Sequence, residues 1–344
     1  MKLTVFPGRD LPAEMRARWS DLQAGDPALA SPYFRPEFTA AVAGARDDVF
    51  VAVLDGGAAF FPFQRGALSV GTPVGGPLSD YHGVIGRGVE PRALLRACGL
   101  RAWDFDHLPA EQAGFAPWKR LETNSPVIDL TQAGAGGSAK LREQCARRHR
   151  KLAREVGEVT LEMHTEDDAV FRHLLAWKSA QYRVSGEFDI FATPWIRKVV
   201  ETIRAQRDAP FAGSLAVLRA GGRPVAAHFG MRSGGVLHYW FPAYDAALGS
   251  YSPGTLLLLA IIDAAPAHGI RVIDLGKGGS FYKDRLANRA VPLWEGSVVA
   301  APWLGAARSA RTAAEGWVRR SPFIGAARRF GGWVRQLERA RRFR

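Results

Sequence analysis

The sequence has few of the features that stabilise small secreted proteins or anchor membrane proteins. Its 344 residues include only two cysteines, Cys98 and Cys145, and neither lies in a Cys-x-x-Cys or zinc-ligand spacing. The N-terminus lacks the apolar core of a signal peptide, and no stretch reaches the ~18 apolar residues that a membrane span needs. We therefore expect a cytoplasmic protein with buried thiols and no bound metal.

Several common catalytic signatures are also missing. The chain has no G-x-S-x-G sequence, which argues against a serine nucleophile. The glycine-rich segment at 276–279 has neither the spacing of a P-loop nor that of a dinucleotide-binding turn. Direct attack of an acceptor on an activated donor needs no covalent intermediate and fits these absences.

The sequence does have an excess of positive charge, and much of it lies near the C-terminus. The formal net charge is +13, and residues 308–344 contain 11 arginines against 2 glutamates. Tryptophan and phenylalanine lie among these arginines, which is typical of amphipathic helices on anionic membranes. A helix packed on the protein body and contact with RNA are the alternatives. We expect residues 301–344 to form a basic tail in peripheral contact with the inner face of a membrane.

Composition divides the rest of the chain into two parts. Residues 49–54 and 58–64 flank Asp55-Gly56-Gly57, which is a strong hairpin signal. The small and flexible run at 131–138 interrupts the alternation of strand and helix signals. We therefore expect one domain at 1–130 and a second at 139–300.

The second part predicts a mixed sheet. Gly-Gly turns join three of its strands into an antiparallel meander, and a helical crossover then implies a parallel pair. The expected elements are a basic helix at 139–156, a strand at 159–165, helices at 169–184 and after Pro194, strands at 214–219, 224–231 and 236–241, a helix at 253–265 and a strand at 270–275. The fold class is therefore α/β (an α+β mixed sheet).

The start of the helix at 253 has the features of an anion site. Ser252 is a good N-cap, Pro253 suits the first helical position, and Gly254 lets a ligand approach the backbone. Free backbone N–H groups and the helix dipole favour phosphate there. A capped core helix without a ligand is the alternative. We expect Ser252, Pro253, Gly254 and Thr255, with Tyr239 on a neighbouring strand, to bind a phosphorylated donor.

Polar residues around this helix are candidates for the chemistry. His228 lies between small residues on its strand, and a histidine can take a proton from an acceptor near neutral pH. A core histidine is the alternative. Tyr244 precedes the helix, while Asp274 and Lys283 follow the last strand, where open α/β sheets place ligands. We expect His228, Tyr244, Asp274 and Lys283 to be catalytic.

Several short motifs in the second part of the chain resemble those of a known family. The segment from about 141 to 286 is similar to the acetyltransferase domain of CelD/BcsL-type proteins, a GNAT-like family linked to cellulose and exopolysaccharide biosynthesis. The matching pieces are Trp177-Lys178-x-x-Gln181-Tyr182, Val225-Ala226-Ala227-His228, Ala243-Tyr244-Asp245, Tyr251-Ser252-Pro253-Gly254 and Gly269-Ile270-x-x-Ile273-Asp274-Leu275-Gly276-x-Gly278 with Tyr282-Lys283.

The resemblance implies an acyltransferase that uses acetyl-CoA or another acyl-CoA, with an acceptor that is a glycan, a glycolipid or an amine. We expect the acceptor to contact Lys178, Gln181, Tyr182, Asp245 and Trp240. The family in turn resembles the Fem-type peptidyltransferases, which have two GNAT-like halves in tandem, so residues 1–130 are expected to be a degenerate first half. Two alternatives stay open: an aminoacyl transferase that uses charged tRNA, which the basic helix at 147–154 favours, and a non-catalytic scaffold that binds anionic polymer or lipid.

Overall fold

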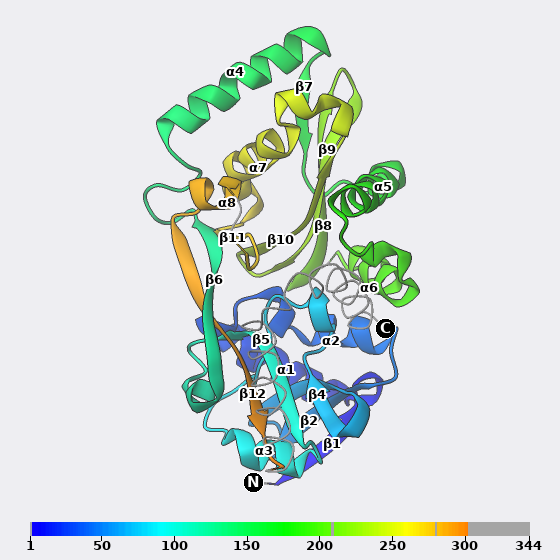
Figure 1. Cartoon of the computed structure of the whole chain (residues 1–344), viewed down its shortest axis with the longest axis vertical. Coiled ribbons are helices and arrows are strands. Elements are labelled where there is room, and N and C mark those ends of the chain that lie inside the picture. Colours follow the sequence, from blue (N-terminus) through cyan, green and yellow to red (C-terminus); the bar gives the residue numbers. More distant parts are fainter. Residues whose placement is uncertain (1, 208–209, 279–280, 302–344) are drawn as a thin grey trace, which may run out of the picture.

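A single sheet runs through the whole molecule (Figure 1). The computed structural model describes residues 2–207, 210–278 and 281–301. The sheet of these residues has twelve strands in the order β1-β2-β3-β4-β5-β12-β6-β11-β10-β9-β8-β7. No helix in these ranges is long and apolar enough to cross a bilayer. The predicted basic tail lies outside the described residues.

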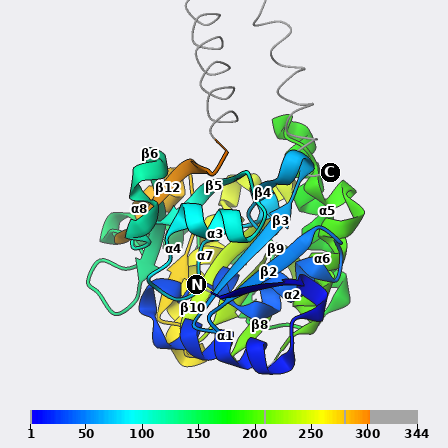
Figure 2. The ribbon, with the colours of Figure 1, turned by 90° about the horizontal axis from the view of Figure 1, so that it is seen from below.

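The first half of the chain forms one end of this sheet. Its elements are β1 (Leu3–Pro7), α1 (Ala13–Gly25), α2 (Pro36–Ala43), β2 (Val49–Leu54), β3 (Ala59–Arg65), β4 (Val70–Thr72), α3 (Pro91–Ala97), β5 (Ala102–Pro109) and β6 (Lys119–Asp129). The hairpin predicted around Asp55 is confirmed, because β2 and β3 pair antiparallel from Leu54↔Ala59 onward. Seen from below, α3 and α1 lie on opposite faces of β2 and β3 (Figure 2).

The second half forms the other end. Its elements are α4 (Ala139–Glu155), β7 (Val159–Glu162), α5 (Asp168–Ser185), α6 (Pro194–Ala205), β8 (Phe211–Ala220), β9 (Arg223–Ser233), β10 (Val236–Tyr244), α7 (Pro253–Ala264), β11 (Val272–Asp274), α8 (Phe281–Leu286) and β12 (Arg289–Val299). The predicted meander β8-β9-β10 is confirmed. Gly221 and Gly222 make its first turn at positive φ, a conformation that other residues rarely adopt.

The order of elements repeats between the halves. Each half has a strand, two helices, a three-strand meander, one helix, a strand parallel to the end of the meander, and a last strand. The parallel pairs are β4-β5 and β10-β11. Thus the structure contains a repeat that the sequence does not reveal, because only the order of elements is shared.

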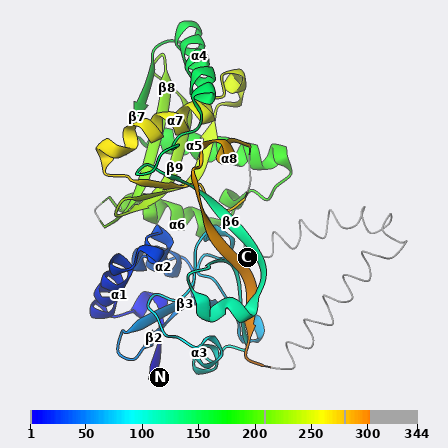
Figure 3. The ribbon, with the colours of Figure 1, turned by 90° about the vertical axis from the view of Figure 1, so that its left-hand side faces the viewer.

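The two halves exchange their last strands. β6 leaves the first half to pair with β11, and β12 returns from the second half to pair with β5, while β6 and β12 pair with each other. Figure 3 shows these two long strands running between the halves. The exchange joins two smaller sheets into one and brings the loops of one half against the strands of the other.

The helices of the second half cover both faces of its strands. α4 and α7 pack on one face, where the apolar run Leu256–Ile262 is buried. α5 and α6 pack on the other face, in a core that also contains Trp19 and Phe38 of the first half. Burial of apolar surface stabilises a fold by about 25 cal/mol per Å². This shared core therefore holds the two halves in a fixed arrangement.

Candidate active site

The parallel strands β10 and β11 separate close to the middle of β10. They pair at only three positions, ending with His238↔Asp274, and β10 then continues to Tyr244. Against β9, β10 has a bulge between His238 and Phe241. Beyond Tyr239 the backbone groups on the β11 side of β10 have no strand partner among the described residues. The expected separation of two parallel strands is therefore present.

An Asp–His–Asp arrangement lies where these strands separate. His238 Nε2 donates a hydrogen bond to Asp80 Oδ2 at 3.0 Å, and His238 Nδ1 lies 3.8 Å from Asp274 Oδ1. His238 and Asp274 belong to the second half, whereas Asp80 comes from the loop after β4 in the first half. The side chain of Asp80 is 26% exposed and that of His238 is fully buried, so Asp80 is the member that a substrate can reach.

Asp274 links the Asp–His–Asp arrangement to three hydrogen-bond donors around it. Its carboxylate accepts hydrogen bonds from Tyr81 Oη at 2.5 Å, Ser125 Oγ at 2.7 Å and the Gly276 N–H at 2.8 Å. These donors come from the first half, from β6 and from the turn after β11. A buried carboxylate with three donors is well satisfied and fixes the imidazole of His238 beside it.

Asp80 is surrounded by groups that favour its ionised form. Burial alone raises the pKa of a carboxylate, but the hydrogen bond and charge of His238 and the charges of His107 and Lys283 outweigh this and lower the pKa of Asp80. His107 Nε2 lies 3.5 Å from Asp80 Oδ1. Asp80 is thus an anion at neutral pH, and it can accept a hydrogen bond from the amine or hydroxyl group of a substrate.

Two buried polar atoms in this cluster lack a hydrogen-bond partner among the described residues. They are Tyr33 Oη and His238 Nδ1. The Tyr33 ring meets the His238 ring edge-on at 4.9 Å and the Trp240 ring at 6.0 Å. Because native proteins pair nearly all buried polar groups, these two atoms leave the cluster able to make further hydrogen bonds, to water or to a ligand.

Five of the predicted residues lie in or around the same cluster. Lys283 Nζ donates to the Gly276 carbonyl at 3.1 Å and interacts with the charges of Asp80 and Asp274. Lys178 on α5 donates to the Pro242 carbonyl at 3.2 Å, lies over the Tyr182 ring, and has its pKa lowered to about 8 by burial. The fold thus brings Asp274, Lys283, Lys178, Tyr182 and Trp240 toward one place. Gln181, also on α5, is half-buried.

His228 lies on the opposite face of the sheet, so its proposed role as the base requires correction. Its side chain is fully buried, its ring stacks on Tyr239 at 4.1 Å, and neither ring nitrogen has a partner among the described residues. Burial lowers the pKa of His228 to about 3. Tyr239 is itself 4% exposed and packs in the core on the α7 side. An acceptor would not reach either residue from Asp80.

This correction gives a first prediction, for His228→Phe. We expect acyl transfer to change less than about threefold. A histidine with a folded pKa near 3 and an unfolded pKa near 6.5 destabilises the fold as the pH falls below about 6.5, because only the unfolded chain then takes up the proton. Between pH 7.5 and 5.5 this group costs the wild type about 1 kcal/mol, which the variant avoids. Urea unfolding at both pH values measures the difference, and a variant as pH-sensitive as the wild type would contradict it.

The start of α7 differs from the expected capped helix. Ser252 adopts a left-handed conformation with φ 54°, and its hydroxyl makes no capping bond. Thr255 and Leu256 both donate to the Ser252 carbonyl, and Pro253 has no N–H, so the Gly254 amide is the donor that the first turn retains. The prediction of a serine cap was wrong because the chain enters the helix directly from a 3-10 turn at Ala246–Tyr251.

Tyr244 and Asp245 mark the path from β10 to α7. Asp245 caps the 3-10 turn by accepting the Ala247 N–H at 3.0 Å. Tyr244 is 37% exposed, and its ring would lie 3.3 Å from a Cβ added at Gly254. Gly254 therefore lets the tyrosine pack on the first turn, and both predicted residues have a structural role here, away from Asp80.

A possible metal-ligand group lies next to the cluster. His82, Asp106 and His107 have ligand atoms within 4.8 Å of one another. His82 Nε2, however, already accepts the N–H groups of Asp106 and His107, both at 3.1 Å, so its lone pair is in use. His107 Nδ1 is hydrogen-bonded to Asp106 Oδ1 at 2.9 Å. These contacts hold His82, Asp106 and His107 together beside Asp80, whose Oδ1 lies 3.5 Å from His107 Nε2.

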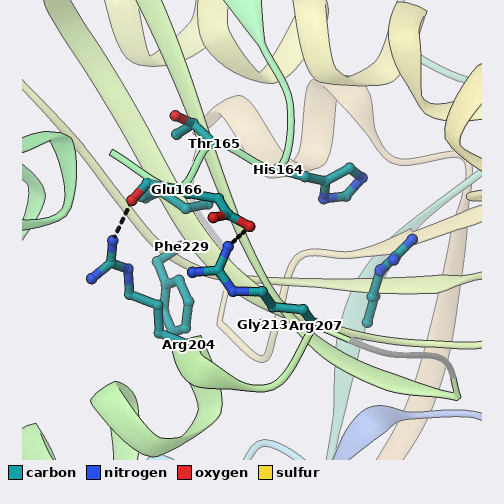
Figure 4. A pocket seen from close by; sticks show the side chains of 9 residues that line it. His164, Thr165, Glu166, Arg204, Arg207, Gly213 and Phe229 are labelled. Carbon is teal, nitrogen blue, oxygen red and sulfur yellow. Dashed lines mark hydrogen bonds and ion pairs between the residues drawn. The ribbon is translucent and has the colours of Figure 1, made fainter. Parts of the chain in front are cut away.

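A cavity of about 200 Å³ lies elsewhere, beside the ends of α6, β8 and β9. Figure 4 shows two of its arginines, Arg204 and Arg207, converging on Glu166. Arg204 also pairs with Asp168 at 2.7 Å. Both of these cations are paired with residues of the chain itself, and none of the residues of the Asp80 cluster lines this cavity.

The sequence analysis missed the first-half side of the site. Tyr33, Asp80, Tyr81 and Ser125 all contribute to the cluster. A usable signal was present at 79–83, where Ser-Asp-Tyr-His-Gly interrupts a glycine- and proline-rich segment. Polar and aromatic residues in such a loop are typical of binding loops.

The fold and this cluster define a GNAT-like α/β protein, and comparisons with known proteins agree. Residues 139–284 match the acetyltransferase (GNAT) domain family. No curated protein matches the chain. Solved structures share the fold at low identity. The C-terminal domain (DUF2156) of a proposed lysylphosphatidylglycerol synthetase from Agrobacterium fabrum is 16% identical, with a TM-score of 0.55 over 84% of this chain and 92% of that one.

Two further solved structures are similar over most of their length. FemX is 9% identical, with a TM-score of 0.55 over 88% of this chain and 98% of that one. L-PGS from Bacillus licheniformis is 12% identical, with a TM-score of 0.51 over 84% and 92%. The matched GNAT domain and the shared fold support an acyltransferase, and they do not identify its substrates.

Proposed function

We propose that the protein is an acyl-CoA-dependent acyltransferase that transfers its acyl group to an amine or hydroxyl of a polysaccharide or glycolipid precursor in exopolysaccharide or cellulose biosynthesis. The observation that carries the transfer reaction is the Asp80–His238–Asp274 arrangement at the separation of β10 and β11. The glycan acceptor rests on the resemblance to CelD/BcsL-type proteins and on no contact in the structure.

The donor is proposed to lie along the open edge of β10. Backbone N–H groups beyond Tyr239 can donate to the thioester carbonyl and stabilise the negative charge that develops during attack. The chain then leads directly to the first turn of α7, where the Gly254 amide and the helix dipole favour a phosphate. An extended thioester with a diphosphate at its far end suits this path.

The acceptor is proposed to bind at Asp80. Its nucleophilic nitrogen or oxygen attacks the thioester carbon, a C–N or C–O bond forms, and the C–S bond breaks to release the CoA thiolate. The proton lost by the acceptor is accepted by Asp80 and passed on to the thiolate or to water. His238 orients Asp80, and Asp274 orients His238.

A contrast between the two halves supports the second half as the one that binds the donor. In the first half, the Glu90 carboxylate accepts the Arg92 N–H at 2.9 Å and the Ala93 N–H at 2.6 Å. A carboxylate in that position uses the amides at the start of α3 and repels phosphate. At the start of α7 no side chain does so. We therefore propose that 139–300 binds the donor, while 1–130 remains a degenerate GNAT-like half that does not bind a donor of its own but contributes Asp80 to the shared site.

The test is thiol release and acyl transfer with acetyl-CoA and longer acyl-CoAs against amino sugars, glycolipids and simple amines. Turnover with any acceptor, together with thermal stabilisation by CoA, supports the proposal. Stabilisation by charged tRNA but not by CoA would contradict the proposal and support an aminoacyl transferase instead. Stabilisation by neither, with no thiol release, would leave a binding scaffold.

A further inference from the structure

The outer side of α4 carries a strip of exposed cations beside the entry to α7. The strip consists of Arg147, Arg148, Lys151 and Arg154. Positions three and four apart lie on one side of a helix, so these residues share a face. The apolar residues of α4, Leu141, Cys145 and Leu152, are buried against the protein body, and Figure 1 shows α4 along the outside of α7.

Two cations of the strip have no ion-pair partner in the described part of the chain. Arg147 pairs with Glu143 at 3.1 Å, and Arg154 pairs with Glu155 at 3.0 Å. Arg148 and Lys151, one helical turn apart, form no such pair. They are therefore the two cations of this strip that are available to an anion.

Lys151 is held close to the start of α7. Its Nζ lies 5.4 Å from the centre of the Tyr251 ring, and Tyr251 Oη donates to Glu155 Oε2 at 2.7 Å. Tyr251 is the last residue of the 3-10 turn and stands two residues before Pro253. These contacts join α4 to the loop that leads from β10 into α7.

We propose that Arg148 and Lys151 bind the phosphates of the donor's nucleotide part and so make the enzyme selective for full-length CoA thioesters. This inference rests on the proposed function, because it assigns the far end of the donor whose thioester lies at β10. Lys151 and Arg148 would take the diphosphate or the 3′-phosphate, with charge-assisted hydrogen bonds from the guanidinium and ammonium groups.

The size and chemistry of the strip favour this ligand over two others. The eight residues from Arg147 to Arg154 span about 10 Å of helix, which suits one nucleotide with its phosphates and is short for a nucleic-acid track. An interfacial membrane helix needs apolar side chains on its outer face, whereas the exposed residues of α4 are charged or small apart from His149. A single phosphorylated donor is the ligand that fits.

The experiment uses the full chain and three donors: acetyl-CoA, acetyl-3′-dephospho-CoA and acetyl-pantetheine, which has no phosphate ester. In the double variant Arg148→Gln/Lys151→Gln we expect the KM for acetyl-CoA to rise about tenfold with kcat unchanged, because the lost contacts bind substrate and transition state equally. The KM for acetyl-pantetheine should stay the same. Arg150→Gln removes the same charge from an outward position of α4 and should change each KM less than twofold.

Calorimetric titration with free CoA separates failure of this inference from failure of the proposed function. A Kd that rises about tenfold in the double variant, with a weaker dependence on salt, supports the inference. An unchanged Kd, or equal KM changes for all three donors, overturns it while the proposed function stands. A wild type that does not bind CoA overturns both. RNA binding that is lost in the double variant while CoA binding is kept would overturn the nucleotide assignment alone.

Discussion

Asp80→Asn is expected to lower kcat/KM for acyl transfer by about 10²–10³-fold, the usual range for removing a general base. The asparagine keeps the shape and an oxygen for His238 Nε2 but has no charge and accepts no proton. The rate should fall at every acceptor concentration, since the lost interaction develops during attack on the thioester. Steady-state kinetics with the best acceptor measures the effect, and thermal unfolding confirms that the variant folds.

The matched control for Asp80 is Asp263→Asn. Asp263 is an exposed aspartate on α7 that pairs with Arg142 at 2.8 Å, far along the helix from its first turn. The same chemical change there should alter kcat/KM less than twofold. Because the pKa of Asp80 is lowered, its carboxylate is present from mildly acidic pH upward and is lost only as the pH falls below the usual aspartate range. An Asp80→Asn variant with more than half of wild-type activity would show that Asp80 is not the general base.

Asp274→Ala is expected to cost about 3–5 kcal/mol of folding free energy, the usual result of removing one partner from a buried charged network. The change leaves Tyr81 Oη, Ser125 Oγ and the Gly276 N–H without their acceptor in a site that is 4% exposed. Each buried donor left unpaired costs about 1–3 kcal/mol. Urea unfolding at neutral pH measures the loss.

Asp274→Asn separates the hydrogen bonds from the charge at this position. The amide oxygen can still accept from Tyr81 or Ser125, so we expect the loss of stability to be at most half that of the alanine variant. Activity should fall in both, because His238 loses the carboxylate beside its Nδ1. An alanine variant within 1 kcal/mol of the wild type would show that the three donors find other partners, and that Asp274 does not hold the halves together.

Local patterns predicted most of the second half well. The helix predicted at 139–156 corresponds to α4, and the helix predicted at 253–265 corresponds to α7. The meander predicted from the Gly-Gly turns is also present. In each case short-range chemistry decides the outcome: helical periodicity, turn residues or proline at a first helical position. The strand expected to reach 165 stops at Glu162, because His164 adopts positive φ.

The site was predicted only in part, and the errors have one cause. Alternation along β9 places His228 away from Phe229, as the sequence indicates, but it does not reveal which face the substrate approaches. Asp274 and Lys283 follow a strand that ends at the site, so their position along the chain already suggested a role. The polar loop at 79–83 suggested at most a binding loop, and it could not show that Asp80 meets His238, which lies 158 residues away in the sequence.

The sequence by itself therefore determined the hairpin of the first half and most elements of the second half with their order, because these depend on interactions between near neighbours in the chain. Only the tertiary structure decided which polar residues meet. The exchange of β6 and β12 brings the loop of Asp80 against β10, and the cores on the two faces of the sheet bury His228 and leave Asp80 accessible. Contacts between distant residues of this kind depend on how whole sheets pack, which no local pattern records.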